Sequence, residues 1–312
     1  MRALLLLLVL AAPLAAQQPD SVAPTQPTRP LNLQPALKPP VADTGIFSPV
    51  PLPEANRVRA PNGAPGPAYW QQRADYTIRA TLDTATRRLS GTEQIRYTNN
   101  SPDTLRFVWM QLDQNLFRPG SIGSLLFAAE SRFGGAGFEG GFEIASLTQT
   151  SSPAPTGTRK RSARPSAPVA LRHRVDDTMM YVDLATPIPP GGTTTFDLAY
   201  AFNVPEHGAD RMGRDGSLYE LAQWYPRMAV YDDVHGWNTD KYLGQGEFYL
   251  EYGDFDYAVT VPAGYIVAGS GTLQNPAEVL TAAQRSRLAA AVKSDTTIAI
   301  ESFSSVSPIA AR

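Results

Sequence analysis

The sequence predicts a mainly β fold: a large antiparallel β-sandwich or saddle-like domain with one inserted helix near residues 276–293. Runs of alternating apolar and polar residues recur along the chain, and short turn-forming segments separate them, such as residues 99–103 (NNSPD) and 189–192 (PPGG). The chain has 312 residues, 43% of them hydrophobic, with 12 Phe and 13 Tyr. This composition is sufficient for a sizeable buried core.

The first three predicted strands form an antiparallel meander. Residues 73–83 (RADYTIRATLD) place four apolar side chains on one face: Tyr76, Ile78, Ala80 and Leu82. Residues 92–99 (TEQIRYTN) alternate in the same way, with Ile95 and Tyr97 on one face. The third strand is predicted within residues 104–115.

Further strands are predicted along the rest of the chain, at residues 141–148, 170–175, 178–188, 193–204, 247–252, 254–262, 264–273 and 296–303. Two stretches are predicted as loops instead. Residues 131–141 are glycine-rich and are followed by a strand rather than by the helix that a phosphate-binding loop requires. Residues 150–168 are rich in Ser, Pro and Thr with four basic residues, which is typical of a solvated insertion.

One helix is predicted, over residues 276–293 (PAEVLTAAQRSRLAAAVK). Pro276 stands at its start, Glu278 in its first turn and Lys293 at its end. These positions suit the missing N–H of proline and the helix dipole.

The N-terminal region predicts export. Residues 1–16 combine Arg2 with a short apolar run and small residues, as in a secretory signal peptide, and a short membrane anchor is the alternative. Residues 17–68 contain thirteen prolines and are predicted to be a disordered linker, followed by a β-domain over residues 69–312. The chain has no cysteine, so neither disulfides nor a lipidated cysteine are expected. We expect a periplasmic or secreted protein.

The sequence contains no complete catalytic set. The net charge is -2, which gives no basic field for nucleic acid. Its three histidines, His173, His207 and His235, are scattered, and neither H-E-x-x-H nor G-x-S-x-G occurs. We therefore expect no catalytic residue and no metal site in this chain.

Residues 218–257 are unusually aromatic, with eleven Phe, Trp and Tyr residues in forty. Periodicity favours core packing for these rings, and contact with a sugar or peptide ligand is the alternative.

Several motifs in and after this region resemble the N-terminal β-domain of the aminopeptidase N family of zinc metallopeptidases (gluzincins), in particular bacterial exported members. They are residues 223–227 (QWYPR), 231–233 (YDD), 236–237 (GW), 246–249 (GEFY), 256–262 (DYAVTVP) and 265–271 (YIVAGSG). Upstream, residues 75–78 and 91–93 resemble the opening hairpin of that domain. The resemblance covers residues 69–312.

The resemblance implies a β-domain that packs on a thermolysin-like catalytic domain, with this chain ending before that domain. Zinc and H-E-x-x-H would belong to the full-length parent, and this chain alone would be inactive and bind no zinc. The resemblance also implies a substrate-binding role for Gln223, whose side-chain carbonyl would accept hydrogen bonds from the free α-amino group of a peptide. A structural role for Gln223, as a cap on a sheet edge or turn, is the alternative. We expect the Gln223 side chain to be exposed at one edge of the β-domain, facing the catalytic domain, with Trp224 and Tyr225 packing behind it. Strand alternation supports this in part, because Gln223 and Trp224 would point to opposite faces.

Two other functions remain open on the sequence. One is a secreted β-sandwich that binds peptide or carbohydrate, which the aromatic density and the missing catalytic set favour. The other is a family member without zinc activity that acts as a scaffold or binder.

Overall fold

The computed structural model describes residues 55–126, 138–151, 166–206, 212–244 and 248–300. The chain divides into two units, Met1–Pro53 and Glu54–Arg312, and all described residues belong to the second. The predicted signal peptide, most of the predicted linker and much of both predicted loops lie outside the described residues.

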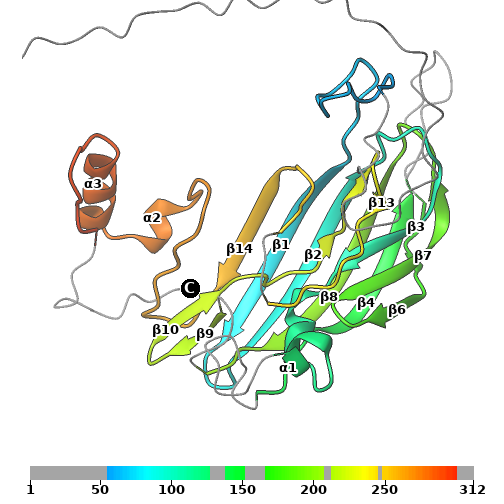
Figure 1. Ribbon diagram of the computed structural model, residues 1–312. Coiled ribbons are helices and arrows are strands. Elements are labelled where there is room, and N and C mark those ends of the chain that lie inside the picture. The colour runs from blue at the N-terminus through cyan, green and yellow to red at the C-terminus, as the bar shows by residue number, and fades with distance from the viewer. Residues whose placement is uncertain (1–54, 127–137, 152–165, 207–211, 245–247, 301–312) are drawn as a thin grey trace, which may run out of the picture. The chain divides into compact units, whose positions relative to one another are not determined.

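A six-stranded sheet forms the largest element, in the order β14-β1-β2-β8-β4-β5 (Figure 1). Its strands are β1 (Arg73–Asp83), β2 (Arg88–Thr98), β4 (Glu143–Ser151), β5 (Val169–Ala170), β8 (Thr193–Asn203) and β14 (Phe255–Thr260). All its pairs are antiparallel except β1 with β14, which is parallel. The predicted antiparallel character is confirmed. The parallel pairing of β14 with β1 at one edge of the sheet was not predicted.

A four-stranded antiparallel sheet has the order β11-β3-β7-β6, and two small ribbons pair β9 with β10 and β12 with β13. Their strands are β3 (Leu105–Gln111), β6 (His173–Asp176), β7 (Met179–Ile188), β9 (Met212–Asp215), β10 (Leu218–Leu221), β11 (Arg227–Met228), β12 (Tyr231–Asp232) and β13 (Gly236–Trp237). The helices are the 3-10 helix η1 (Asp113–Phe117), α1 (Ile122–Leu126), α2 (Pro276–Val279) and α3 (Ala282–Ala291).

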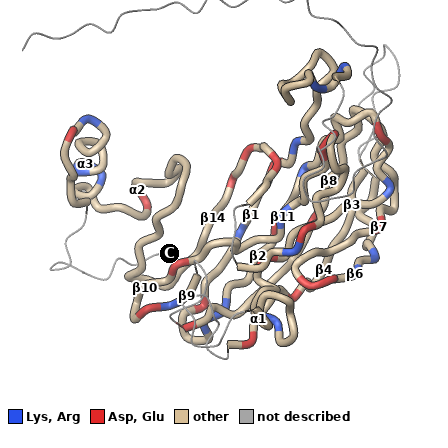
Figure 2. The backbone as a smooth tube through the Cα atoms, viewed as in Figure 1, with Lys and Arg blue, Asp and Glu red and all other residues tan. Residues whose placement is uncertain are grey.

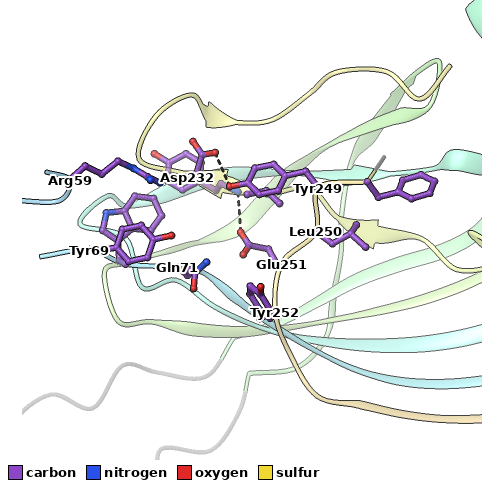
Figure 3. A pocket seen from close by; sticks show the side chains of 12 residues that line it. Arg59, Tyr69, Gln71, Asp232, Tyr249, Leu250, Glu251 and Tyr252 are labelled. Atoms are coloured by element: carbon purple, nitrogen blue, oxygen red, sulfur yellow. Dashed lines mark hydrogen bonds between the residues drawn. The ribbon is translucent and has the colours of Figure 1, made fainter. Parts of the chain in front are cut away.

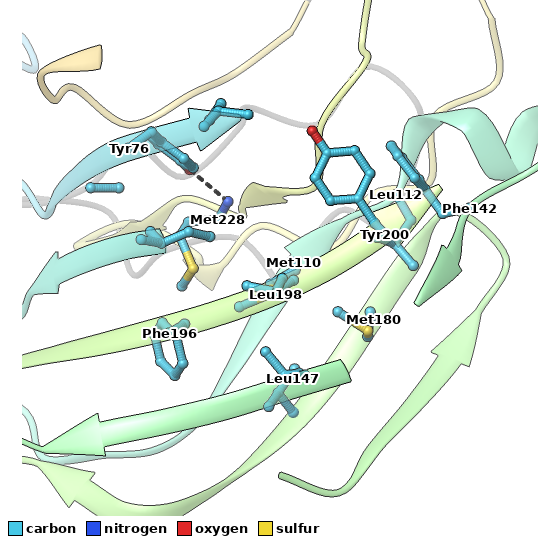
Figure 4. Packing of buried hydrophobic residues seen from close by; sticks show 14 of the residues in the cluster. Tyr76, Met110, Leu112, Phe142, Leu147, Met180, Phe196, Leu198, Tyr200 and Met228 are labelled. Atoms are coloured by element: carbon cyan, nitrogen blue, oxygen red, sulfur yellow. Dashed lines mark hydrogen bonds between the residues drawn. The ribbon is translucent and has the colours of Figure 1, made fainter. Parts of the chain in front are cut away.

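The two large sheets share one apolar core, as expected of a sandwich. Alternation along β1 and β8 buries every second residue, because successive side chains of a strand point to opposite faces. Buried side chains come from both sheets, among them Tyr76, Phe196 and Leu198 from the larger sheet and Met110 and Met180 from the smaller one (Figure 4).

The predicted helix is present but divided. α2 ends at Val279, and α3 begins after Thr281, which has extended backbone angles. Thr281 and Gln284 form a reciprocal capping box: the Gln284 N–H donates to the Thr281 hydroxyl at 3.2 Å, and the Thr281 N–H donates to the Gln284 side chain at 2.7 Å. This T-x-x-Q pattern starts a second helix within the predicted range.

Three predicted strands do not form in the described residues. Of residues 248–252, Tyr252 alone makes a bridge, to Arg73. Residues 264–273 are irregular, because Gly264 and Gly271 adopt positive φ (93° and 99°) that strand backbone does not use. Residues 296–300 have no sheet partner, and the rest of that predicted strand lies outside the described residues.

Acidic and basic residues are interspersed over the described elements rather than separated into opposite halves (Figure 2). Several form ion pairs between strands, such as Arg88 with Glu143 at 2.5 Å. Every helix in the described ranges is too short or too polar to cross a bilayer.

Candidate functional site

The QWYPR segment forms a bend between two strands. β10 ends at Leu221 and β11 begins at Arg227, so Gln223 does not lie in a strand. Gln223 has a positive φ of 48°, which a non-glycine residue adopts at a cost in strain. The strand alternation expected for Gln223 and Trp224 is therefore wrong, because tertiary contacts fold these residues into a bend.

A glutamine from η1 holds this bend in place. The buried Gln114 side chain donates from Nε2 to the carbonyl oxygens of Ala222 at 3.1 Å and of Gln223 at 3.0 Å. Two neighbouring carbonyls that a strand would pair in a ladder are thus satisfied by one side chain. Gln114 thus holds the bend through backbone carbonyls, and the Gln223 side chain takes no part in these contacts.

The Gln223 side chain is half-buried. The backbone carbonyl of Gln223 accepts the hydrogen bond from Gln114. The side-chain amide of Gln223 makes no hydrogen bond with the described residues. An amide that its own domain does not use can accept a hydrogen bond from a ligand.

An ion pair buried beneath the bend joins Arg227 to Asp113. The two side chains are only 7% and 3% exposed, and an Arg227 Nη donates to Asp113. Burial raises the pKa of Asp113, and the Arg227 guanidinium partly offsets this effect. The guanidinium also lies over the Phe248 ring, 4.5 Å from its centroid.

Aromatic rings of the bend pack against the sheet edge. Trp224 contacts Tyr225 and Tyr257, at ring-centroid distances of 5.1 and 6.1 Å. Tyr225 contacts Tyr76 at 5.6 Å and Phe255 at 6.0 Å. These rings of the aromatic-rich region therefore contribute to packing, as the periodicity favours.

A buried carboxyl that the sequence reasoning missed lies in the same core. Glu93 is 3% exposed, and neither of its carboxyl oxygens has a hydrogen-bond partner among the described atoms. Burial raises its pKa well above the ordinary value and so favours the neutral form of this carboxyl. Its position could have been found, because alternation along β2 puts Glu93 on the same face as Ile95 and Tyr97.

The two histidines that the structure describes take no part in a metal site. His173 lies exposed in β6, His235 lies exposed in the turn before β13, and His207 is outside the described residues. Among the described residues, no group of three or more His, Cys, Asp or Glu side chains could hold a metal ion. The residues described in this chain therefore do not fit zinc, which requires three or four close ligands.

Comparison with known proteins gives matches among solved structures alone. No family model matches the chain, and no curated protein matches it. The chain is similar to the M1 zinc metallopeptidase of Deinococcus radiodurans, with 14% identity and a TM-score of 0.30 over 65% of this chain and 37% of that one. A mutant of that enzyme bound to a Tyr-Ser-Ala substrate gives 14% identity, a TM-score of 0.29 and the same coverage.

A two-domain M1 zinc metallopeptidase mutant bound to L-tryptophan gives 13% identity and a TM-score of 0.31, over 68% of this chain and 39% of that one. The chain thus spans less than two fifths of the length of these structures. Structural similarity with such low identity and TM-scores gives no information on function, which has to be argued from the site itself.

Proposed function

We propose that residues 69–312 are the non-catalytic N-terminal β-domain of an exported zinc aminopeptidase-like protein, and that this domain helps to shape the pocket for the substrate N-terminus. The proposal includes a signal peptide at residues 1–16 and a proline-rich linker at residues 17–68. Its support is the resemblance of residues 223–271 to that family, together with the way the QWYPR segment is held.

One observation carries the proposal: the backbone of Gln223 is held in a strained conformation, while its side chain takes no part in holding it. Gln114 clamps the carbonyls of residues 222 and 223, and the Arg227–Asp113 pair anchors the next turn of chain. A residue that only capped a turn would use its own side chain to do so. Strain maintained by the surroundings is typical of functional positions.

In this proposal Gln223 acts by binding and selection. Its side-chain carbonyl oxygen accepts a hydrogen bond from the α-ammonium group of a peptide. An N-acetylated peptide has a neutral amide in place of that group. The chemistry of peptide-bond cleavage would be supplied by zinc and by residues outside this chain, so no catalytic step is assigned here.

The test uses the longer polypeptide that the proposal requires. The downstream coding sequence should contain H-E-x-x-H within roughly 100 residues, the distance expected if the thermolysin-like domain follows directly. In that protein, Gln223→Ala should lower kcat/KM for aminoacyl 4-nitroanilides, mostly through a higher KM. The corresponding loss of transition-state binding free energy should be about 1.5–3 kcal/mol, the value of a hydrogen bond to a charged group.

Alanine at position 223 keeps a non-glycine residue at the positive φ, so Gln223→Ala changes the side chain without relieving the backbone strain. Gln223→Glu should retain activity, because a carboxylate also accepts from an ammonium group. Gln274→Ala is the matched control, since Gln274 is exposed and its side chain donates to the nearby Thr272 carbonyl, at 2.8 Å. Unchanged kinetics in Gln223→Ala would reduce Gln223 to a structural residue.

A further inference from the structure

A cavity of about 580 Å³ lies between three segments of the chain, none of which includes Gln223. Residues 69–71 form one side, residues 230–232 the second and residues 248–252 the third, with Arg59 at the rim (Figure 3). This volume is within the range of about 300–1,000 Å³ that small-molecule sites occupy.

Much of the wall is aromatic. Trp70 stacks on Tyr231 with ring centroids 5.7 Å apart and an interplanar angle of 27°, which fixes both rings. Tyr249 and Tyr252 also line the cavity and are 53% and 74% exposed. Exposed rings beside rigid ones give the cavity accessible π faces.

Two carboxyl groups, of Asp232 and Glu251, lie among these rings (Figure 3). Asp232 Oδ2 accepts hydrogen bonds from Tyr249 Oη at 3.2 Å and from Asn238 Nδ2 at 3.0 Å. Burial acts to raise the pKa of Asp232, but hydrogen bonds from His235 and other neighbours outweigh it and lower the pKa. Asp232 is therefore a fixed negative charge.

Glu251 is less well satisfied. Its Oε1 accepts from the Tyr231 N–H at 3.2 Å, and burial raises its pKa to about 7. A cation entering the cavity would favour the ionised form of this carboxyl.

The cationic side chain at the rim, Arg59, stands over the Tyr69 ring, 5.2 Å from its centroid, and its charge also acts on Asp232. Arg59 binds Asp233 with two hydrogen bonds, of 2.6 and 2.8 Å, so its charge is already paired. The Glu251 carboxyl and the exposed Tyr249 and Tyr252 rings are thus the lining groups available to a cation, beside the negative charge of Asp232. A sugar needs donors and acceptors in comparable number, whereas an alkylammonium ion needs negative charge and π faces, and a primary ammonium needs acceptors as well.

We propose that this cavity binds an alkylammonium ion, held by the carboxylates of Asp232 and Glu251 and by the faces of the surrounding aromatic rings. Cations are attracted to the faces of Trp and Tyr rings, most strongly where water is partly excluded. The ion can be a free quaternary amine or the side chain of a lysine in a peptide. The proposal does not rest on the role of Gln223.

The experiment is calorimetric titration of the purified chain with choline chloride and, separately, with N-acetyl-lysine methylamide, at constant ionic strength. At least one cation should bind saturably, and maltose should not. Binding of choline alone identifies a free amine as the ligand, and binding of the lysine derivative alone identifies a peptide side chain.

Variants locate the binding to this cavity. Glu251→Gln keeps the shape of the side chain and should weaken cation binding about tenfold, the loss expected for one favourable charge contact. Tyr249→Leu should weaken it as well, whereas Tyr249→Phe should keep most of the affinity because the ring face remains. Glu220→Gln, at an exposed position of β10, is the matched control and should change nothing.

Far-ultraviolet circular dichroism of each variant checks that the fold is intact. The proposal is overturned if neither cation binds saturably, if folded Glu251→Gln binds cations as tightly as the parent chain, or if maltose binds more tightly than both cations.

Discussion

Replacing Arg227 with methionine removes the positive charge of the buried ion pair beneath the QWYPR bend. Asp113, 3% exposed, is then left without its charged partner. Removing one member of a buried pair costs about 3–5 kcal/mol, because the remaining charge has lost its hydration and its counter-ion.

The expected loss of unfolding free energy can be calculated from the cost of protonating Asp113. The variant can relieve the uncompensated charge by protonating Asp113, which from an ordinary pKa of about 3.9 costs about 4 kcal/mol at pH 7 and about 1.5 kcal/mol at pH 5. The folded-state pKa of Asp113 in the variant is raised above its unfolded value, so the variant loses stability as the pH rises. The difference from the parent chain should therefore shrink on acidification.

The assay is urea unfolding followed by tryptophan fluorescence at pH 5 and pH 7, at the same ionic strength. Arg79→Met is the control, because the Arg79–Asp256 pair is 52% and 72% exposed and should contribute at most about 1 kcal/mol. Combining Arg227→Met with Asp113→Leu removes both charges and should recover part of the loss. A loss below about 1 kcal/mol at pH 7 that does not change with pH would refute this reasoning.

Three further predictions concern the core and the helix start. Because burial raises the folded-state pKa of Glu93, the chain should lose stability as the pH rises above the unfolded value of about 4.3, and Glu93→Gln should reduce this slope in urea unfolding at pH 5 and 8; an unchanged slope would argue against a buried neutral carboxyl. Tyr76→Phe should cost about 1–3 kcal/mol in the same assay, since the Met228 N–H donates to Tyr76 Oη at 2.9 Å and would be left unpaired in the core, whereas no loss would mean that this N–H finds another partner. Thr281→Ala should destabilise α3 by about 0.5–2 kcal/mol, measured as faster amide exchange at Gln284, and unchanged exchange would contradict the capping role.

Local alternation made much of the fold predictable. Along β1 and β8 every second side chain is buried, so the sequence pattern identified both the strands and the faces that form the core. The same rule places Glu93 inside, although its charge at neutral pH argued against that position. The split between α2 and α3 was missed, although Thr281 and Gln284 carry the T-x-x-Q capping pattern.

The candidate sites depended on contacts between residues far apart in the chain. Gln114 holds the backbone of residues 222–223 across 108 and 109 positions, and Arg59 reaches Asp233 across 174. No local period encodes such pairs, so the motif around Gln223 could be recognised in the sequence but its bend could not.

The sequence by itself determined the long strands β1, β2 and β8 and which of their faces are apolar, because both follow from a two-residue period. The tertiary structure alone decided that β14 adds to β1 in parallel, that Gln223 lies in a clamped bend, and that rings and carboxyls from three segments surround one cavity. These features depend on which distant groups satisfy each other's hydrogen bonds and charges once the core has formed.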